Sequence, residues 1–129
     1  MSTPAYDIAQ IIGDLSTMPT YGTGLYVSSE PLVPDDTITI FDTGGFPPDV
    51  ASNYQRPTVQ VRVRNRNYIS GYAILSEIKD LLHGSNSFEE GGYIYTGIWA
   101  MGDIIPLGYD SNGRALLTLN FRIHRTAVN

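Results

Sequence analysis

The residue best placed to take part in a reaction is Asp42, which follows two apolar residues and precedes Thr43, Gly44 and Gly45. A carboxylate in such a segment can serve as a general acid or base when a second carboxylate lies beside it. Two close carboxylates cannot both ionise, so they share one proton. The chain holds one such segment, so this chemistry would need two copies of the chain, each contributing its Asp42.

The segment Ile40–Gly44 resembles the active-site signature of aspartic proteases, and Ile104–Gly108 resembles their later apolar-apolar-glycine element. One distant alternative is therefore a homodimeric aspartic protease that uses Asp42. The other interpretation, which we favour, is that Asp-Thr-Gly-Gly turns the chain at a strand end, because a three-residue motif carries little weight alone. The residues that follow, Gly45-Phe46-Pro47-Pro48, depart from the protease pattern. Two amphipathic helices also do not suit an all-β protease.

Three arginines, Arg62, Arg64 and Arg66, alternate with other residues in and just after a predicted strand. Alternate residues of a strand point to one face about 6.6 Å apart, a spacing that suits carboxylates or phosphates. Three like charges on one face repel one another, so they need acidic neighbours or an anion. The sequence leaves three interpretations open. They are a subunit interface, direct DNA contact, and a solvated face or one paired within the chain to Glu77, Asp80 or Asp110.

Other catalytic and cofactor motifs cannot be read in the sequence. The chain has no cysteine, which excludes disulfides, thiol nucleophiles and cysteine-ligated metal centres. Two histidines, His83 and His124, leave little for a metal site, and no Ser-His-Asp arrangement is legible. Gly22-Thr23-Gly24 lacks the glycine and lysine of a phosphate-binding loop. We therefore expect no catalytic residue, no metal and no cofactor.

Composition limits the class of protein. The 129 residues fit one domain, so we expect a single domain over residues 1–129. Only 16% of the residues are charged, against a typical ~25%, which indicates a protein that covers much of its surface with partners. The net charge of −5 argues against bulk binding to DNA or anionic lipid. No apolar run approaches the roughly 18 residues of a membrane span, and no signal-peptide pattern is present. We expect a soluble protein made inside the cell, with no membrane partner.

Hydrophobic spacing predicts the elements that would position these residues. Apolar residues at helical spacing predict one helix from an N-cap at Thr3 to Met18-Pro19, and a second over Ile69–His83. Strands are predicted at Thr37–Phe41, Pro57–Asn65, Tyr93–Met101 and Ala115–Arg125. Trp99, in the middle of the third of these strands, is expected in the core.

Glycines and prolines predict a long loop from Asp42 to about Arg56. A loop of this length in a small domain usually serves a function or contacts a partner. The order of the elements predicts an α+β fold: a mainly antiparallel sheet with two helices packed on one face.

Four segments carry a family resemblance: Ile40–Pro48, Arg56–Arg64, Ile78–Leu82, and Leu107–Arg114 with the following Leu119–Arg122. Together they resemble the small minor capsid or tail-completion proteins of long-tailed bacteriophages, which are similar to tail terminators. The resemblance runs from about Thr37 to Arg125, and the order of the elements agrees.

The resemblance implies a structural virion protein with an α+β fold and no catalytic residues. Tail terminators form a hexameric ring on the last ring of tail-tube subunits, stop the tube from polymerising and offer the joining surface for the head. The implied partners are further copies of the chain, the tail tube protein and the head-tail connector or stopper protein. The implied location is the tail or neck of the virion, after assembly in the host cytoplasm. A head-completion protein of the phage neck is the alternative.

A ring joins one surface of each subunit to a different surface of the next. The expected interface comprises Phe46, Pro47, Pro48, Arg62, Arg64 and Arg66. Phe46 would be the apolar anchor of the Gly-Gly-Phe-Pro-Pro segment, and the arginines would pair with acidic groups of the adjacent subunit. An acidic ring would also let DNA slide through its channel without specific binding, because like charges repel the DNA backbone.

Overall fold

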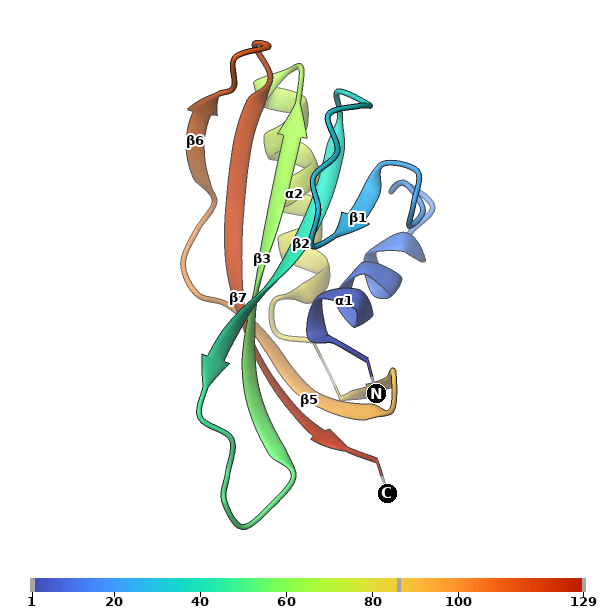
Figure 1. Ribbon diagram of the computed structural model, residues 1–129, viewed down its shortest axis with the longest axis vertical. Coiled ribbons are helices and arrows are strands. Elements are labelled where there is room, and N and C mark those ends of the chain that lie inside the picture. The colour runs from blue at the N-terminus through green and yellow to red at the C-terminus, as the bar shows by residue number, and fades with distance from the viewer. Residues whose placement is uncertain (1, 86, 129) are drawn as a thin grey trace.

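The computed structural model describes residues 2–85 and 87–128 of the chain. It has two layers, a curled seven-stranded sheet and two helices on one of its faces (Figure 1). The helices are α1 (Pro4–Gly13) and α2 (Tyr68–Leu82). The strands are β1 (Leu25–Val27), β2 (Thr37–Phe46), β3 (Tyr54–Asn65), β4 (Phe88–Glu90), β5 (Tyr93–Ala100), β6 (Ile105–Tyr109) and β7 (Ala115–Ala127).

The strand order is β1-β2-β3-β7-β5-β4, and β6 also pairs with β7. Every pairing is antiparallel except that of β1 with β2. The predicted α+β class and mainly antiparallel sheet are confirmed. Within the described residues, no helix has the length and apolar character of a membrane span.

Helix α1 begins where the sequence predicts. The side chain of Thr3 accepts a hydrogen bond from the Tyr6 amide, and Pro4 occupies the first turn, where its missing N–H costs nothing. The helix ends earlier than predicted, because Asp14 caps it after Gly13 while Met18 and Pro19 lie beyond.

Helix α2 is capped by Asn67, whose side chain accepts from the Ser70 amide. It buries Leu75, Ile78 and Leu82, whereas Tyr72, which the same helical spacing would place with them, is exposed. Gly71 takes the place next to the sheet instead, and a methyl group there would lie 3.0 Å from the Leu117 side chain. The close approach of helix and sheet therefore leaves little room for a side chain at this position.

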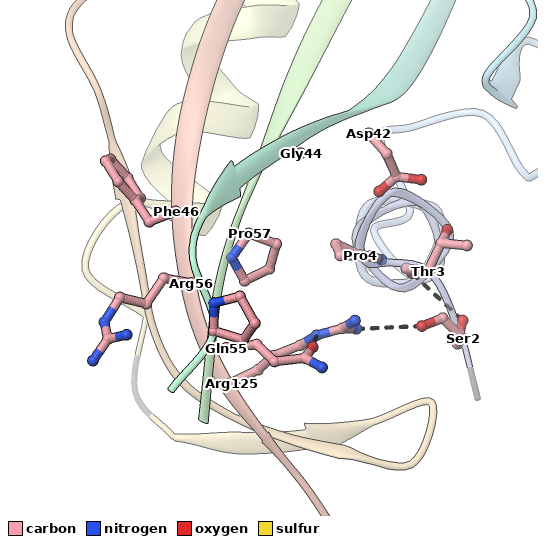
Figure 2. Close-up of a pocket in the computed structure, with 11 residues that line it drawn as sticks. Ser2, Thr3, Pro4, Asp42, Gly44, Phe46, Gln55, Arg56, Pro57 and Arg125 are labelled. Atoms are coloured by element: carbon pink, nitrogen blue, oxygen red, sulfur yellow. Dashed lines mark hydrogen bonds between the residues drawn. The ribbon is translucent and has the colours of Figure 1, made fainter. Parts of the chain in front are cut away.

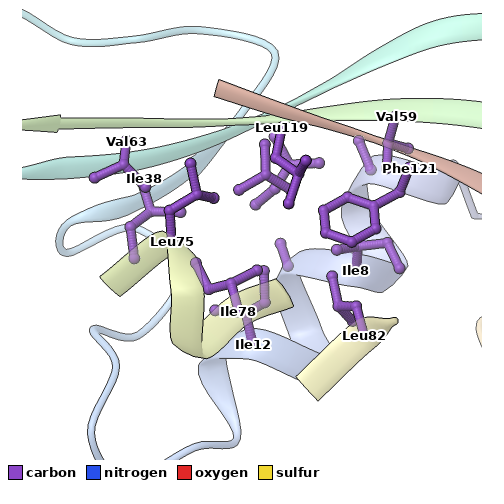
Figure 3. Packing of buried hydrophobic residues seen from close by; sticks show 14 of the residues in the cluster. Ile8, Ile12, Ile38, Val59, Val63, Leu75, Ile78, Leu82, Leu119 and Phe121 are labelled. Carbon is purple, nitrogen blue, oxygen red and sulfur yellow. The ribbon is translucent and has the colours of Figure 1, made fainter. Parts of the chain in front are cut away.

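The core lies between the helices and the inner face of β3 and β7. The two central strands pair over almost their whole length, and their alternate residues point inward. Figure 3 shows this apolar layer, in which both helices meet the sheet. Its fully buried members include Ile8, Ile12, Val59, Leu75, Ile78, Leu119 and Phe121. Truncating one such side chain to alanine typically costs about 2–5 kcal/mol.

The predicted loop from Asp42 to Arg56 is mostly strand, which corrects the sequence interpretation. β2 continues to Phe46, and β3 already begins at Tyr54, so the connection is residues 47–53. Gly44 and Gly45 have φ values of +82° and +122° and form a bulge at which the register with β3 shifts. A Cβ on Gly45 would lie 2.5 Å from the carbonyl oxygen of Arg56. The two glycines therefore bend a strand pair that continues past them.

Trp99 is a second correction. Its strand neighbour Ile98 is fully buried, whereas Trp99 is half-buried and pairs in register with Arg122, which is exposed. Successive residues of a strand point to opposite faces. Trp99 therefore lies on the outer face of the sheet, away from both helices.

Candidate protein-interaction surface

The hairpin of β2 and β3 carries the exposed residues that the sequence singles out. Phe46 is 48% exposed, Pro47 and Pro48 are exposed, and Val50 is fully exposed at the tip. The tip is closed by an ion pair of 2.9 Å between Arg56 and Asp49. The hydrogen bond from Arg56 lowers the pKa of the Asp49 carboxyl. The hairpin thus presents apolar side chains on an ordered arm, which projects beyond the helices (Figure 1).

A hollow of about 440 Å³ lies between this hairpin and the start of α1. Figure 2 shows Pro57 on the sheet side with Pro4 facing it from the helix, whereas the Phe46 side chain borders the hollow and points away from the helix. Arg125 closes the inner wall and donates to the carbonyl oxygen of Ser2 at 3.3 Å. The hollow is lined by apolar groups with a few charged ones, as are many surfaces that accept a side chain from a partner.

Asp42 has a structural partner. Its Oδ1 accepts a hydrogen bond from the Ala5 amide at 2.9 Å, which ties the first turn of α1 to β2. Asp42 lies within β2, before the bulge, so the interpretation that its segment turns the chain at a strand end is wrong. The apolar-glycine element at Ile104–Gly108 falls largely in β6, which pairs with β7 and not with β2. The two segments that resemble protease elements are thus separate strands of one sheet.

The arginine row has partners within the chain, and they differ from those the sequence indicates. Arg62 pairs with Glu30 at 3.1 Å, and Arg66 pairs with Asp36 at 3.2 Å. Burial raises the pKa of Asp36, but its hydrogen bonds to Arg66 outweigh this and the net pKa is lowered. None of the three described arginines of the row pairs with Glu77, Asp80 or Asp110.

Arg64 is the centre of this network. It is 3% exposed and donates to the carbonyl oxygens of Pro31 at 2.6 Å and Pro34 at 2.7 Å. Arg114 acts beside it, donating to the carbonyl oxygen of Leu32 at 2.7 Å and to Asp110 at 2.8 Å. We call residues 28–36 the strap, since these two buried guanidinium groups hold it across the outer face of the sheet. The role of Arg114 was not predicted from the sequence, although its position four residues after Asp110, across a turn, is a recognisable spacing for an ion pair.

A buried cluster of polar side chains, Asp7, Tyr95 and Arg125, ties α1 to strands β5 and β7. The hydroxyl of Tyr95 donates to Asp7, and Arg125 lies 3.7 Å from the same carboxylate. Burial raises the pKa of Tyr95, and its hydrogen bond to Asp7 raises it further. Arg125 also donates to Gln55 at 3.0 Å. These contacts involve Oδ2 of Asp7, whereas its Oδ1 is buried without a hydrogen-bond partner among the described residues. The contacts of Oδ2 secure the helix to the sheet.

The lower outer face carries a row of rings that the sequence does not reveal, because its members come from three strands. Tyr54 of β3 contacts His124 of β7 edge-on, with ring centroids 5.5 Å apart. His124 contacts Trp99 of β5 at 4.8 Å. Arg56 and Arg122 lie over the two outermost rings, at 5.1 Å from Tyr54 and 5.3 Å from Trp99. We call these five residues the aromatic row.

The fold is shared with a protein of a virus-like particle. A chain from the virion of a native gene transfer agent particle superposes with a TM-score of 0.61 at 13% sequence identity. The match covers 93% of this chain and 84% of that chain. No curated protein matches the sequence.

The sequence, compared with known protein families, matches one of them over most of its length. Residues 7–127 match the bacteriophage tail terminator family, so the chain belongs to that family. The resemblance drawn from the sequence segments is confirmed. The protein is a structural component of a phage tail, and its family consists of structural rather than catalytic proteins.

Proposed function

We propose that the protein forms a ring, a hexamer, that caps the phage tail tube, stops its polymerisation and provides the surface on which the head is joined. The observation that carries the proposal is the family match over residues 7–127. The structure supports it with exposed apolar side chains at two separate places. One is the hairpin around Phe46, and the other is β6, whose five residues are all exposed. A closed ring needs two such different surfaces on each subunit.

The contact residues of this ring follow from exposure. Phe46, Pro47 and Pro48 bury against the neighbouring subunit, with Phe46 as the anchor. Arg62 and Arg66 keep enough exposure to add an acidic partner from that subunit. Arg64 contributes differently, because it is sealed inside its own chain and holds the strap in position.

The partners of the ring are the tail tube protein on one side and the head-tail connector or stopper protein on the other. DNA passes through the channel without specific binding, since the chain carries a net charge of −5. The ring assembles in the host cytoplasm and stays in the tail or neck of the virion.

Electron microscopy of particles from a phage lacking this gene tests the proposal. Overlong tubes of variable length beside filled, tailless heads are the expected result. Tails of normal length beside heads that leak DNA would contradict it and would identify a head-completion protein of the neck instead.

A further inference from the structure

We propose that the aromatic row is the surface that receives the acidic helical side of a neighbouring copy of this chain. The inference rests on the proposed ring and names one of its two contact surfaces. The row lies on the outer face of the sheet, and the acidic side lies on the helices that cover the inner face.

The row is held in place by its own chain before any partner arrives. The Tyr54 hydroxyl lies 3.0 Å from Nδ1 of His124 and 3.0 Å from the Thr96 hydroxyl. The ring of Trp99 lies so close to β5 that a Cβ on Gly97 would be 2.3 Å from it. Glycine at this position is what allows the indole to lie flat on the outer face.

The row carries the one Lys or Arg side chain that forms no ion pair within residues 2–85 and 87–128. All eight Lys and Arg residues fall within the described residues, and seven of them lie within ion-pair distance of Asp or Glu. The eighth is Arg122, which is exposed and contacts the ring of Trp99. Beside it, Met101 is 52% exposed and borders a hollow of about 320 Å³. This corner therefore offers a positive charge next to open apolar surface.

The helical side has the opposite character. Asp14, Glu77 and Asp80 are exposed and have no cationic partner among the described residues. Glu77 accepts a hydrogen bond from Thr17, which places the segment after α1 beside α2. Three of the six Asp and Glu residues that have no ion pair among the described residues thus lie on α2 or just after α1, and make the helical side acidic, while Arg122 lies on the sheet. The other three are Asp42 of β2 and Glu89 and Glu90 of β4.

These two surfaces complement each other in charge and lie on opposite faces of one chain. Contact between them is head-to-tail, the kind that closes into a ring. The row also continues into the proposed hairpin contact, because Arg56 is the register partner of Phe46 and shares its face of the sheet (Figure 2). A single unpaired cation is too little for DNA, whose binding needs several phosphate contacts. The observations therefore favour a second copy.

Charge reversal tests the contact in the full-length protein. Arg122→Glu should weaken self-association at least tenfold in sedimentation velocity over a concentration series. Adding Glu77→Lys and Asp80→Lys to the same chain should restore association to within about threefold of wild type, because every copy then carries both reversed surfaces. Lys79→Glu changes the net charge by the same amount as Arg122→Glu but on the acidic side, between Glu77 and Asp80, where a further carboxylate keeps the two surfaces complementary. It is the charge-matched comparison and should associate at least as tightly as wild type. Thermal unfolding of each variant checks that the fold is intact.

Each result has one meaning. If Arg122→Glu associates as tightly as wild type while rings still form, the inference is overturned and the proposed ring stands. If the wild-type protein forms no ring on its own or on tail tubes, the proposed function fails and the inference fails with it. DNA binding that depends on Arg122 would also overturn the inference, since it would assign the row to nucleic acid.

Discussion

The guanidinium Nη2 of Arg64 lies 2.6 Å from the carbonyl oxygen of Pro31, joining residues 33 positions apart in the chain. The strap and the central strand are thereby fixed to each other by a side chain that is almost completely buried. A buried guanidinium with several acceptors is costly to remove, because its partners lose their donors.

Replacing Arg64 with methionine should therefore lower the free energy of unfolding by about 3 kcal/mol. Urea denaturation measures this change. Arg66→Met is the control, since the Arg66 side chain is 70% exposed, and its loss should cost no more than about 0.5 kcal/mol. Equal losses for the two variants would show that the strap is not held by Arg64.

Phe46→Ser should leave stability almost unchanged and weaken ring formation. The side chain is about half exposed in the isolated chain, so its removal opens no cavity. An interface anchor is worth about 2 kcal/mol or more, which corresponds to roughly thirtyfold weaker association. Native mass spectrometry of the ring measures this effect. Ile69→Ser, an exposed apolar position at the start of α2, is the control and should assemble normally.

The two glycines of the β2 bulge should respond differently to alanine. Gly44→Ala adds a methyl group into open space at a positive φ, which costs about 1 kcal/mol. Gly45→Ala brings its methyl group against the backbone of Arg56 and Pro57 and should cost about 3 kcal/mol or more. Thermal unfolding compares the two variants. A smaller loss for Gly45→Ala than for Gly44→Ala would contradict the bulge geometry.

The pKa of His124 is lowered by burial and then by the positive charges of Arg122 and Arg56. As the pH falls through the ordinary histidine pKa of about 6.5, the unfolded chain takes up this proton before the folded chain does. The free energy of unfolding should therefore decrease as the pH falls through that window.

Arg122→Gln should raise the pKa of His124, because it removes one of the two neighbouring positive charges. An NMR titration of the imidazole signals measures the change in the monomeric protein. Lys79→Gln should leave the pKa of His124 where it is. An unaltered pKa in Arg122→Gln would show that Arg122 does not act on the ring.

Substitutions of Asp42 distinguish a structural role of this residue from a catalytic one. Asp42→Ala removes the acceptor for the Ala5 amide and should cost about 1 kcal/mol, the usual worth of such a cap. Asp42→Asn keeps an oxygen acceptor and should unfold close to wild type and form normal rings. Cleavage of a protein substrate by wild type that is sensitive to pepstatin and lost in Asp42→Asn would contradict the structural role.

The helices and strands whose apolar residues recur at a regular spacing could be predicted from the sequence. The alternation of Val59, Val61 and Val63 gave the central strand and its inner face, and the spacing of Ile8 and Ile12 gave the buried side of α1. These patterns are legible because one side of each element is buried over several residues. The short strands β1, β4 and β6 carry no such repeat.

The candidate surface was harder to predict, because its contacts join distant segments. The exposure of Phe46 agrees with the sequence, yet the loop expected around it is mostly a bulged strand pair. The carboxylates that pair with Arg62 and Arg66 come from the strap, about thirty residues earlier. Whether Trp99 lies on the inner or the outer face of the sheet depends on the register of β5 with β7. The apolar residues of the segment alone do not determine that register.

The order of the hairpin tip has a kinetic consequence. The Asp49 amide donates to the carbonyl oxygen of Tyr54 at 3.2 Å, and the ion pair of Asp49 with Arg56 spans the same turn, so the arm has its shape before it meets a neighbour. A contact segment that is already ordered loses little conformational entropy when it docks. Collision between subunits, rather than a folding step, should therefore set the pace at which a ring grows, and the lifetime of each contact should decide whether it closes.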